Sequence, residues 1–262
     1  MSDPARQFPL PNNDVDLTGQ VALVTGASSG LGWRFAQVLA AAGATVVAGA
    51  RRTDRLAALT AEIEASGGRC RPVELDVTAA EGFGAVIDDI EAHEGLVTIL
   101  VNNAGVPDAQ RAHKMSLELI DQVLDTNVRG PFVLACEVAR RLIAAERPGR
   151  IVNLSSAGAF NYGGTGAALY SVSKAAINRI TEVLAVEWAR NHINVNAIAP
   201  GAFSSEMMDG MIGRLGDFTQ YTPRKRLGDP AQLDSTLLYL VAPASEFVTG
   251  TVILVDDGQG PR

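Results

Sequence analysis

The sequence predicts an α/β protein built as a single doubly wound domain, with a seven-stranded parallel sheet covered by helices on both faces. Three observations predict it. Short apolar, β-branched runs alternate with longer segments of helical period, and strands separated by helices require crossovers that make the sheet parallel. The first run leads directly into a glycine-rich turn and a helix. A length of 262 residues, 47% of them apolar, suits one large domain.

Each element follows from its own stretch of sequence, and the order is Rossmann-like. The seven expected strands are short and apolar: VALVT (21–25), TVVAGA (45–50), CRPVELDV (70–77), VTILVNNAG (97–105), RIVNLSS (150–156), INVNAIAP (193–200) and TVILVDDG (251–258). The expected helices have an amphipathic period: one ending at Ala42, one at Glu64, one at Glu94, a long one over 117–145, one opened by Tyr170 and one from Pro230 to Val241. A loop-rich stretch lies between the sixth strand and the last helix.

The chain shows no internal repeat and no linker that would divide it. Residues 1–17, rich in Pro, Asn and Asp, are expected to be a flexible tail, and 18–262 a single domain for dinucleotide binding and catalysis. Within this domain, residues 202–228 are expected to form a substrate lid.

Composition excludes several classes of function. With 22 basic and 29 acidic side chains, the net charge of -7 gives no electrostatic footprint for nucleic acid or a membrane surface. Cys70 and Cys136 are too few and too far apart for a disulfide framework, and His93, His113 and His192 form no ligand pattern, so no metal is expected. Without a secretory signal or an apolar run of about 20 residues, the protein is expected to be soluble and cytoplasmic.

The turn after the first strand reads TGASSGLG, residues 25–32. Its glycines allow a sharp turn, and amides at the start of the next helix can bind a phosphate. The candidate pyrophosphate-binding residues are Gly26, Ser28, Gly30, Leu31 and Gly32. A tight turn without any ligand is the alternative.

The second strand ends in AGARRTD, with Arg51 and Arg52 where a cofactor with a free ribose 2′-hydroxyl would require an acid. An arginine fork suits a 2′-phosphate, which favours NADP(H) over NAD(H). NAD(H) stays possible, since both arginines could simply solvate the start of the next helix.

Two Tyr–Lys pairs have a spacing of four residues. Tyr221 and Lys225 flank Pro223, which disfavours a helix interior, so that spacing has no special meaning. Tyr170 and Lys174 open a proline-free amphipathic run, where residues four apart lie on one helix face. A cation at that distance can lower the pKa of a phenol, so we expect a proton-transfer pair; a half-buried Tyr beside a snorkelling Lys is the alternative.

The fifth strand ends at Ser155 and Ser156, at the sheet edge where Tyr170 is also expected. A hydroxyl there could hold a carbonyl oxygen while the phenol transfers a proton. These motifs occur in one order along the chain: TGASSGLG, NNAG at 102–105, Asn127 in TNVRG, Ser156, the Tyr170/Lys174 pair and PG at 200–201. In this order the chain resembles the short-chain dehydrogenase/reductase family from about Leu17 to Gly258.

The resemblance implies a set of roles. Tyr170 is the catalytic acid/base, Lys174 lowers its pKa and binds the nicotinamide ribose, Ser156 positions the substrate oxygen, and Asn127 supports a water relay. It further implies these cofactor contacts: Arg51 for NADP, Asp76 and Val77 for the adenine, Asn103, Ala104 and Gly105 for the adenosine side, and Pro200, Gly201, Phe203 and Ser205 for the nicotinamide end. It also implies a homo-oligomer, tetramer or dimer, assembled through the helices near 117–145 and 170–190.

The sequence departs from the family pattern in two places. Fourteen positions separate Ser156 from Tyr170 where thirteen are usual, so Ser155 could replace Ser156, although the strand alignment favours Ser156. Ser205 stands where threonine is commoner, and its hydroxyl can do the same work.

These features predict an NADP(H)-dependent oxidoreductase that interconverts a carbonyl and a secondary alcohol of a small molecule by hydride transfer. The alternatives are an NAD-dependent alcohol dehydrogenase of the same fold and a non-catalytic NADP-binding regulator. Met207, Met208 and Met211 could line an apolar substrate pocket or only pack the lid against the body.

Overall fold

The computed structural model describes residues 11–164, 166–217 and 219–260. The tail therefore lies partly outside the described residues, as do position 218 of the expected lid and residues 261–262 of the domain.

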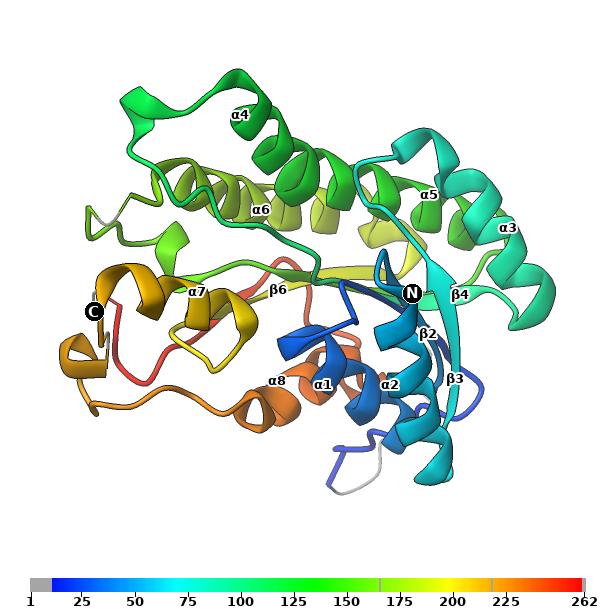
Figure 1. Ribbon diagram of the computed structural model, residues 1–262. Coiled ribbons are helices and arrows are strands. Elements are labelled where there is room, and N and C mark those ends of the chain that lie inside the picture. The colour runs from blue at the N-terminus through cyan, green and yellow to red at the C-terminus, as the bar shows by residue number, and fades with distance from the viewer. Residues whose placement is uncertain (1–10, 165, 218, 261–262) are drawn as a thin grey trace.

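All seven expected strands form, and they make one parallel sheet of order β3-β2-β1-β4-β5-β6-β7 (Figure 1). Every neighbouring pair of strands runs parallel. Their bounds are β1 Val21–Thr25, β2 Thr45–Ala50, β3 Arg69–Glu74, β4 Val97–Asn102, β5 Gly149–Leu154, β6 Ile193–Pro200 and β7 Val252–Val255. The strand order reverses between β1 and β4, and a crevice forms there beyond the carboxyl ends of the strands.

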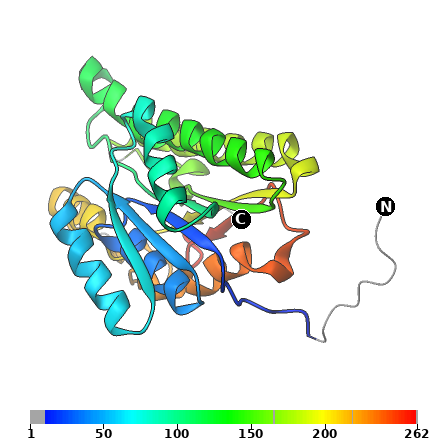
Figure 2. The same ribbon diagram turned by 90° about the vertical axis from the view of Figure 1, so that its right-hand side faces the viewer.

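Helices cover both faces of the sheet (Figure 2). On one face lie α1 Gly30–Ala41, α2 Thr53–Ala65 and α8 Asp234–Val241; on the other lie α3 Phe83–His93, α5 Gly130–Ala144 and α6 Ala168–Glu187. Two more helices, α4 Leu117–Leu124 and α7 Glu206–Leu215, lie toward the end of the sheet that carries the crevice.

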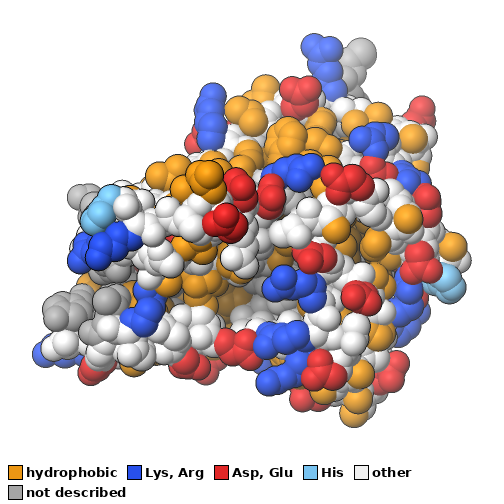
Figure 3. Space-filling view, turned by 45° about the horizontal axis from the view of Figure 1, so that its top comes forward, with side chains coloured by type: hydrophobic (Ala, Val, Ile, Leu, Met, Phe, Trp, Pro, Cys, Tyr) orange, Lys and Arg blue, Asp and Glu red, His pale blue; other side chains and the backbone are white. Residues whose placement is uncertain are grey.

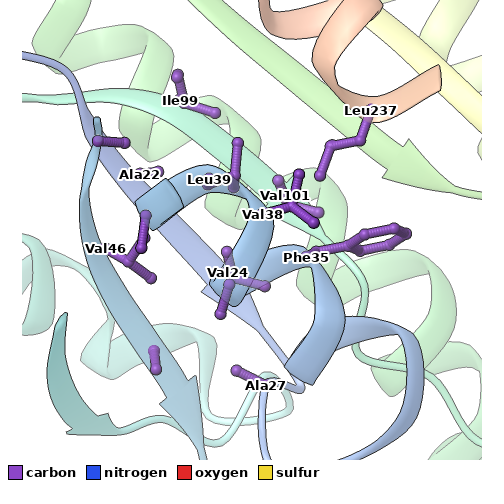
Figure 4. Close-up of a cluster of buried hydrophobic side chains, with 14 of the residues drawn as sticks. Ala22, Val24, Ala27, Phe35, Val38, Leu39, Val46, Ile99, Val101 and Leu237 are labelled. Atoms are coloured by element: carbon purple, nitrogen blue, oxygen red, sulfur yellow. The ribbon is translucent and has the colours of Figure 1, made fainter. Parts of the chain in front are cut away.

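The hydrophobic core is divided by the sheet into two clusters. Figure 4 shows part of the first, which contains Phe35 and Leu39 of α1, Val24 of β1 and, near Phe35, Leu237 of α8, all with 0% exposure. The second cluster packs α3, α5 and α6 on the opposite face. Because both faces of the central strands are buried, those strands read as continuous apolar runs.

Three elements differ from the sequence prediction. The long helix over 117–145 is divided into α4, a π-helical turn at Asp125–Arg129 and α5. The helix expected from Pro230 begins as a 3₁₀ turn at Pro230–Leu233, since proline suits a first turn but lacks an amide to donate. The stretch expected to be loop-rich contains α7, whose start is capped by Ser205 through a bond from the Met208 amide of 3.2 Å.

The packed chain begins one residue before the expected boundary. Leu17 is only 1% exposed, and its amide donates to the Ala42 carbonyl at 2.8 Å. Residues 11–16 are exposed. Within the described part of the chain, no helix is both long and apolar enough to cross a membrane.

Candidate active site

A cavity of about 760 Å³ lies beyond the carboxyl ends of the strands, and its walls come from the loops that follow all seven strands and from α6 and α7. Hydrophobic side chains show inside the hollow in the middle of the face drawn in Figure 3, with charges of both signs around it. Most of the residues selected from the sequence meet in this cavity.

The glycine-rich turn forms the floor at β1. Gly26 and Gly30 have φ of +67° and +55°, in the left-handed region that favours glycine. A Cβ on Gly26 would lie 2.8 Å from the Ala104 Cα, and a Cβ on Gly32 would lie 2.4 Å from the Gly26 carbonyl oxygen. The turn therefore needs glycine at both positions. Gly32 does not line the cavity, so it contributes to the close packing of the turn and not to the cavity wall.

Asn103, at the end of β4, holds this turn in place. Its Nδ2 donates to the carbonyls of Thr25 at 2.9 Å and Gly26 at 3.2 Å. In return Thr25 Oγ1 accepts from the amides of Asn103 and Ala104 at 3.0 and 3.1 Å. The start of α1 is left open to the cavity, since Ser29 makes no side-chain cap there. Its amides and positive dipole end fit a pyrophosphate.

The two arginines after β2 differ in their contacts and in their exposure. Arg52 donates to Ser28 Oγ at 3.2 Å and Ser29 Oγ at 2.8 Å, and it pairs with Glu206 at 3.0 Å. The guanidinium holds the pKa of Glu206 below its usual range. Arg51 is 65% exposed and lies 4.0 Å from Asp76 Oδ2. Both arginines of the predicted fork line the cavity, and Arg52, which the family resemblance did not single out, is the one bonded to the glycine-rich turn.

Tyr170 and Ser156 face each other across the cavity. The Ser156 hydroxyl lowers the pKa of the Tyr170 phenol, and Ser156 Oγ accepts from the Gly158 amide at 3.1 Å. Ser155 is turned the other way: it is 4% exposed and its hydroxyl contacts Asn178 Oδ1 and the Lys174 carbonyl of α6. Of the two serines that the sequence left as alternatives, Ser156 is therefore the one beside the phenol.

Burial and two neighbouring groups shift the pKa of Tyr170. Burial raises it, the Ser156 hydroxyl lowers it and the charge of Asp108 raises it, with a net rise above the ordinary value. Lys174 Nζ lies 5.7 Å from the Tyr170 ring centroid and donates to the Leu154 carbonyl at 2.7 Å. Burial lowers the pKa of Lys174 to about 8. Burial is the largest influence on the Tyr170 pKa, and the lowering expected from Lys174 stays a prediction.

Asn127 lies behind the cavity wall. It is 0% exposed and sits in the π-helical turn, where its Oδ1 accepts from the Val106 amide at 2.8 Å. Its Nδ2 donates to the Val106 carbonyl at 2.9 Å and to Ser173 Oγ at 3.1 Å. With these bonds Asn127 joins the segment after β4 to α6, and it does not line the cavity.

The other selected residues line the cavity as follows. At the nucleotide end are Gly26, Ser28, Gly30, Leu31, Asp76, Val77, Asn103, Ala104 and Gly105; at the far end are Pro200, Gly201, Phe203 and Ser205. Ser205 Oγ caps α7 rather than standing free. Gln259, which the sequence did not single out, accepts from the Ala202 amide at 2.8 Å and so fixes the chain after Gly201.

Helix α7 contributes apolar side chains to the cavity wall. Met207, Met208 and Met211 all line it from α7, together with Arg214. The Tyr221/Lys225 pair has no helical geometry, since 219–221 is a 3₁₀ turn and Lys225 has a left-handed φ of 51°. Among the described residues, no three His, Cys, Asp or Glu side chains are grouped as a metal ion would require.

Comparisons with known proteins agree with this geometry. The family model described as short chain dehydrogenase matches residues 20–212. Gluconate 5-dehydrogenase of Gluconobacter oxydans is 35% identical over 249 residues, 92% of this chain and 95% of that protein. A 3-oxoacyl-[acyl-carrier-protein] reductase of Synechocystis is 35% identical over 244 residues, 92% of this chain and 97% of that one.

A solved structure extends the likeness to three dimensions. The gluconate 5-dehydrogenase of Burkholderia cenocepacia, in complex with NADP and tartrate, superposes with a TM-score of 0.88 at 30% identity, covering 95% of this chain and 98% of that one. Because the family model matches residues 20–212 and these relatives are 30–35% identical over more than nine-tenths of the chain, the chain belongs to the short chain dehydrogenase family.

Proposed function

We propose that the protein is an NADP(H)-dependent oxidoreductase that interconverts a carbonyl compound and a secondary alcohol. One observation carries the proposal: Tyr170, with Lys174 Nζ 5.7 Å from its ring centroid, lines the same cavity as Ser156 and the glycine-rich turn. A proton donor and a dinucleotide cradle in one cavity are what carbonyl reduction requires.

The residues present fit such a cofactor. Open amides at the start of α1 suit the pyrophosphate, and Arg51 and Arg52 at the end of β2 suit a 2′-phosphate. When bound, NADPH supplies the hydride that the carbonyl carbon receives. The NADP in the Burkholderia cenocepacia relative supports the choice of cofactor.

The chain's own residues handle the proton. Ser156 holds the substrate oxygen by a hydrogen bond, and Tyr170 gives that oxygen its proton as the carbonyl becomes an alcohol. A Tyr170 pKa above the ordinary value keeps the phenol protonated near neutral pH, which favours reduction. Lys174, fixed by the Leu154 carbonyl, places a cation beside the ribose position, and Asn127 supports it indirectly through the Val106 segment.

The lid is part of the proposal. Residues 202–228 include α7, which presents Met207, Met208 and Met211 to the cavity and is joined to the glycine-rich turn by the Arg52–Glu206 pair. A helix with three flexible apolar side chains adapts well to a substrate. The substrate itself is proposed only as a ketone or a secondary alcohol.

We also propose that the protein is a cytoplasmic homo-oligomer, a tetramer or dimer. Leu117 of α4 is 73% exposed, and Val172 and Val186 of α6 are 62% and 79% exposed. Apolar side chains on adjacent helices support an interface between copies. Two free cysteines, Cys70 and Cys136, support a reducing compartment.

The experiment that tests the function is Tyr170→Phe. A screen of ketones and secondary alcohols with both cofactors, followed by NADPH absorbance, first identifies an active substrate. The variant should lose carbonyl reduction by about 10²- to 10⁴-fold, because general acid catalysis contributes that much, while it still binds NADPH. Tyr239→Phe, at an exposed position of α8 outside the cavity, should keep full activity.

Two results would overturn the proposal. Turnover that persists in Tyr170→Phe would remove the catalytic assignment. NADPH binding without turnover of any carbonyl or alcohol in the wild type would favour the non-catalytic regulator.

A further inference from the structure

Asp108 is a buried carboxylate beside the proton donor that the reaction described above does not use. It follows Gly105 by three residues, in the segment after β4, and is 2% exposed. Burying a carboxylate is costly unless the oxygens are bonded. The bonds that Asp108 makes therefore indicate why it is there.

The first oxygen caps the helix that carries Tyr170. Asp108 Oδ2 accepts from the Leu169 amide at 2.7 Å and from the Tyr170 amide at 3.1 Å. These are first-turn amides of α6, which lack partners within the helix. Ala167, the residue at the N-cap position, has no side-chain bond to supply. Asp108 thus provides from another segment the anionic cap that the helix sequence lacks.

The segment that carries Asp108 is itself fixed. Two residues earlier, Val106 exchanges both of its backbone bonds with Asn127. Asn127 also donates to Ser173 Oγ, which in turn donates to the Tyr170 carbonyl at 2.7 Å. Tyr170 is therefore held at its amide by Asp108 and at its carbonyl through Ser173 and Asn127.

The next residue of the helix is tied to the serine side of the site. Ser171 Oγ donates to the Gly158 carbonyl, and the Gly158 amide donates to Ser156 Oγ at 3.1 Å. The start of α6 is thus connected both to the Asp108 segment and to the segment that carries Ser156. A shift of the first turn of α6 would change the distance between the two groups that touch the substrate oxygen.

We propose that Asp108 is a positioning residue of the reaction: by capping α6 from the segment after β4, its carboxylate sets where the Tyr170 phenol stands relative to Ser156. This inference rests on the proposed function and deepens it.

The second oxygen gives Asp108 an electrostatic effect as well. Asp108 Oδ1 is buried and has no hydrogen-bond partner among the described residues. Burial is the largest effect on the Tyr170 pKa and raises it. The Ser156 hydroxyl lowers this pKa, and the negative charge of Asp108 raises it. Among the described residues that line the cavity, the charged side chains are Arg51, Arg52, Asp76, Lys174, Glu206 and Arg214. Lys174 of α6 contacts the Tyr170 ring, and Arg214 of α7 donates to the carbonyl of Ala109, next to Asp108. Asp108 therefore favours the protonated phenol, the form that donates a proton.

Two variants separate position from charge. Asp108→Ala removes the cap. We expect kcat for carbonyl reduction to fall about 10²-fold, because a small displacement of a catalytic group has an effect of that size. The NADPH dissociation constant should be unchanged. Asp108→Asn keeps an oxygen that can accept from both amides, so most of kcat should return. Ser116→Ala is the matched control, because Ser116 caps the neighbouring α4 by accepting from the Leu119 amide at 3.2 Å. It should leave kcat unchanged.

The pH profile gives a readout that a purely structural role would not move. Tyr170 donates a proton only when protonated, so reduction is present below its pKa and is lost as pH rises through it. Removing the negative charge in Asp108→Asn should lower that pKa and move the alkaline limb to lower pH. The same shift should appear in a titration of tyrosinate absorbance, as the difference between each protein and its Tyr170→Phe counterpart.

The outcomes are distinct. Wild-type kcat in Asp108→Ala, or a loss no larger than in Ser116→Ala, would overturn the positioning role. An unmoved Tyr170 titration in Asp108→Asn would overturn the electrostatic effect. The titration needs no turnover, so it tests Asp108 even if the wild type reduces no carbonyl, the result that would instead defeat the proposed function.

Discussion

At the scale of single residues, the cofactor end shows a division between two neighbouring arginines. Arg52 is already bonded to Ser28 and Ser29 of the glycine-rich turn, whereas Arg51 is more exposed and only approaches Asp76. A charge-assisted hydrogen bond to phosphate is worth about 1.5–3 kcal/mol. We therefore expect the two side chains to contribute separately to binding of the 2′-phosphate.

The corresponding variants are Arg51→Ala and Arg52→Ala. Each should weaken NADPH binding by about tenfold or more, the equivalent of one such bond, and leave NADH binding nearly unchanged. Dissociation constants for both cofactors, measured by titration, check this. Arg179→Ala, which removes a 75% exposed arginine of α6 paired with Glu182, is the control. Equal binding of NADH and NADPH by the wild type would contradict the preference for NADP.

Residue chemistry is also where the sequence alone falls short. The Tyr170/Lys174 spacing predicted a pair on one helix face, and the structure gives 5.7 Å between Nζ and the ring centroid. The direction of the Tyr170 pKa could not be predicted, because it depends on burial and on Asp108, 62 positions away in the chain. Long-range contacts of this kind leave no local pattern.

At the scale of elements, the turn between β1 and α1 depends on close backbone approaches. The Asn103 side chain donates hydrogen bonds to two carbonyls of the turn, those of Thr25 and Gly26. Gly32 lies against the Gly26 carbonyl. Added methylene groups in such a packed place cost about 1–3 kcal/mol. By contrast, Gly84 of α3 has open space, since no atom lies within 4 Å of a Cβ placed there.

These two glycines make a matched test. Gly32→Ala should lower the free energy of unfolding by about 1–3 kcal/mol and weaken NADPH binding, because the turn must shift. Gly84→Ala, in the first turn of α3 and with open space for a Cβ, should not lower the free energy of unfolding. Urea unfolding and a cofactor titration measure both effects. Unimpaired NADPH binding by Gly32→Ala would contradict the role given to the turn.

The sequence predicted elements correctly where an apolar pattern continued over a whole segment. It did not reveal the place where the helix type changes. The strands and α1 follow from apolar runs and the glycine-rich turn. The π-helical turn at Asp125–Arg129 interrupts a segment whose apolar pattern continues on both sides, so periodicity could not reveal it. For α7 a signal existed: Ser205 as cap, acids Glu206 and Asp209 in the first turn and Arg214 in the last.

At the scale of the whole molecule, the sheet separates the core into two clusters and gathers the chemistry at one edge. Fold class and strand number were predictable because a parallel sheet needs buried strands and crossover helices. The outer face of α4 and α6 differs from the helix faces that pack against the sheet. It carries exposed apolar residues that the single chain does not cover.

For this face we expect assembly to be sensitive to charge. Val186→Arg introduces a cation at a position 79% exposed on α6, so it should leave folding intact but weaken the proposed interface between copies. Sedimentation velocity should show a shift toward smaller species. Val15→Arg, at a 40% exposed position outside these helices, should not change the distribution. A monomeric wild type would contradict the proposal.

The segment between β5 and α6, which the sequence predicts to carry one extra residue, is anchored on both sides of the site. Gly158 bonds Ser156 and Ser171, and Arg111 donates to the Gly164 carbonyl at 2.8 Å. This segment also supplies Ala157, Gly158, Asn161, Tyr162 and Gly163 to the cavity wall. Changes in the sequence or length of this segment are therefore expected to alter substrate selectivity. The positions of the catalytic hydroxyls of Ser156 and Tyr170 should stay the same.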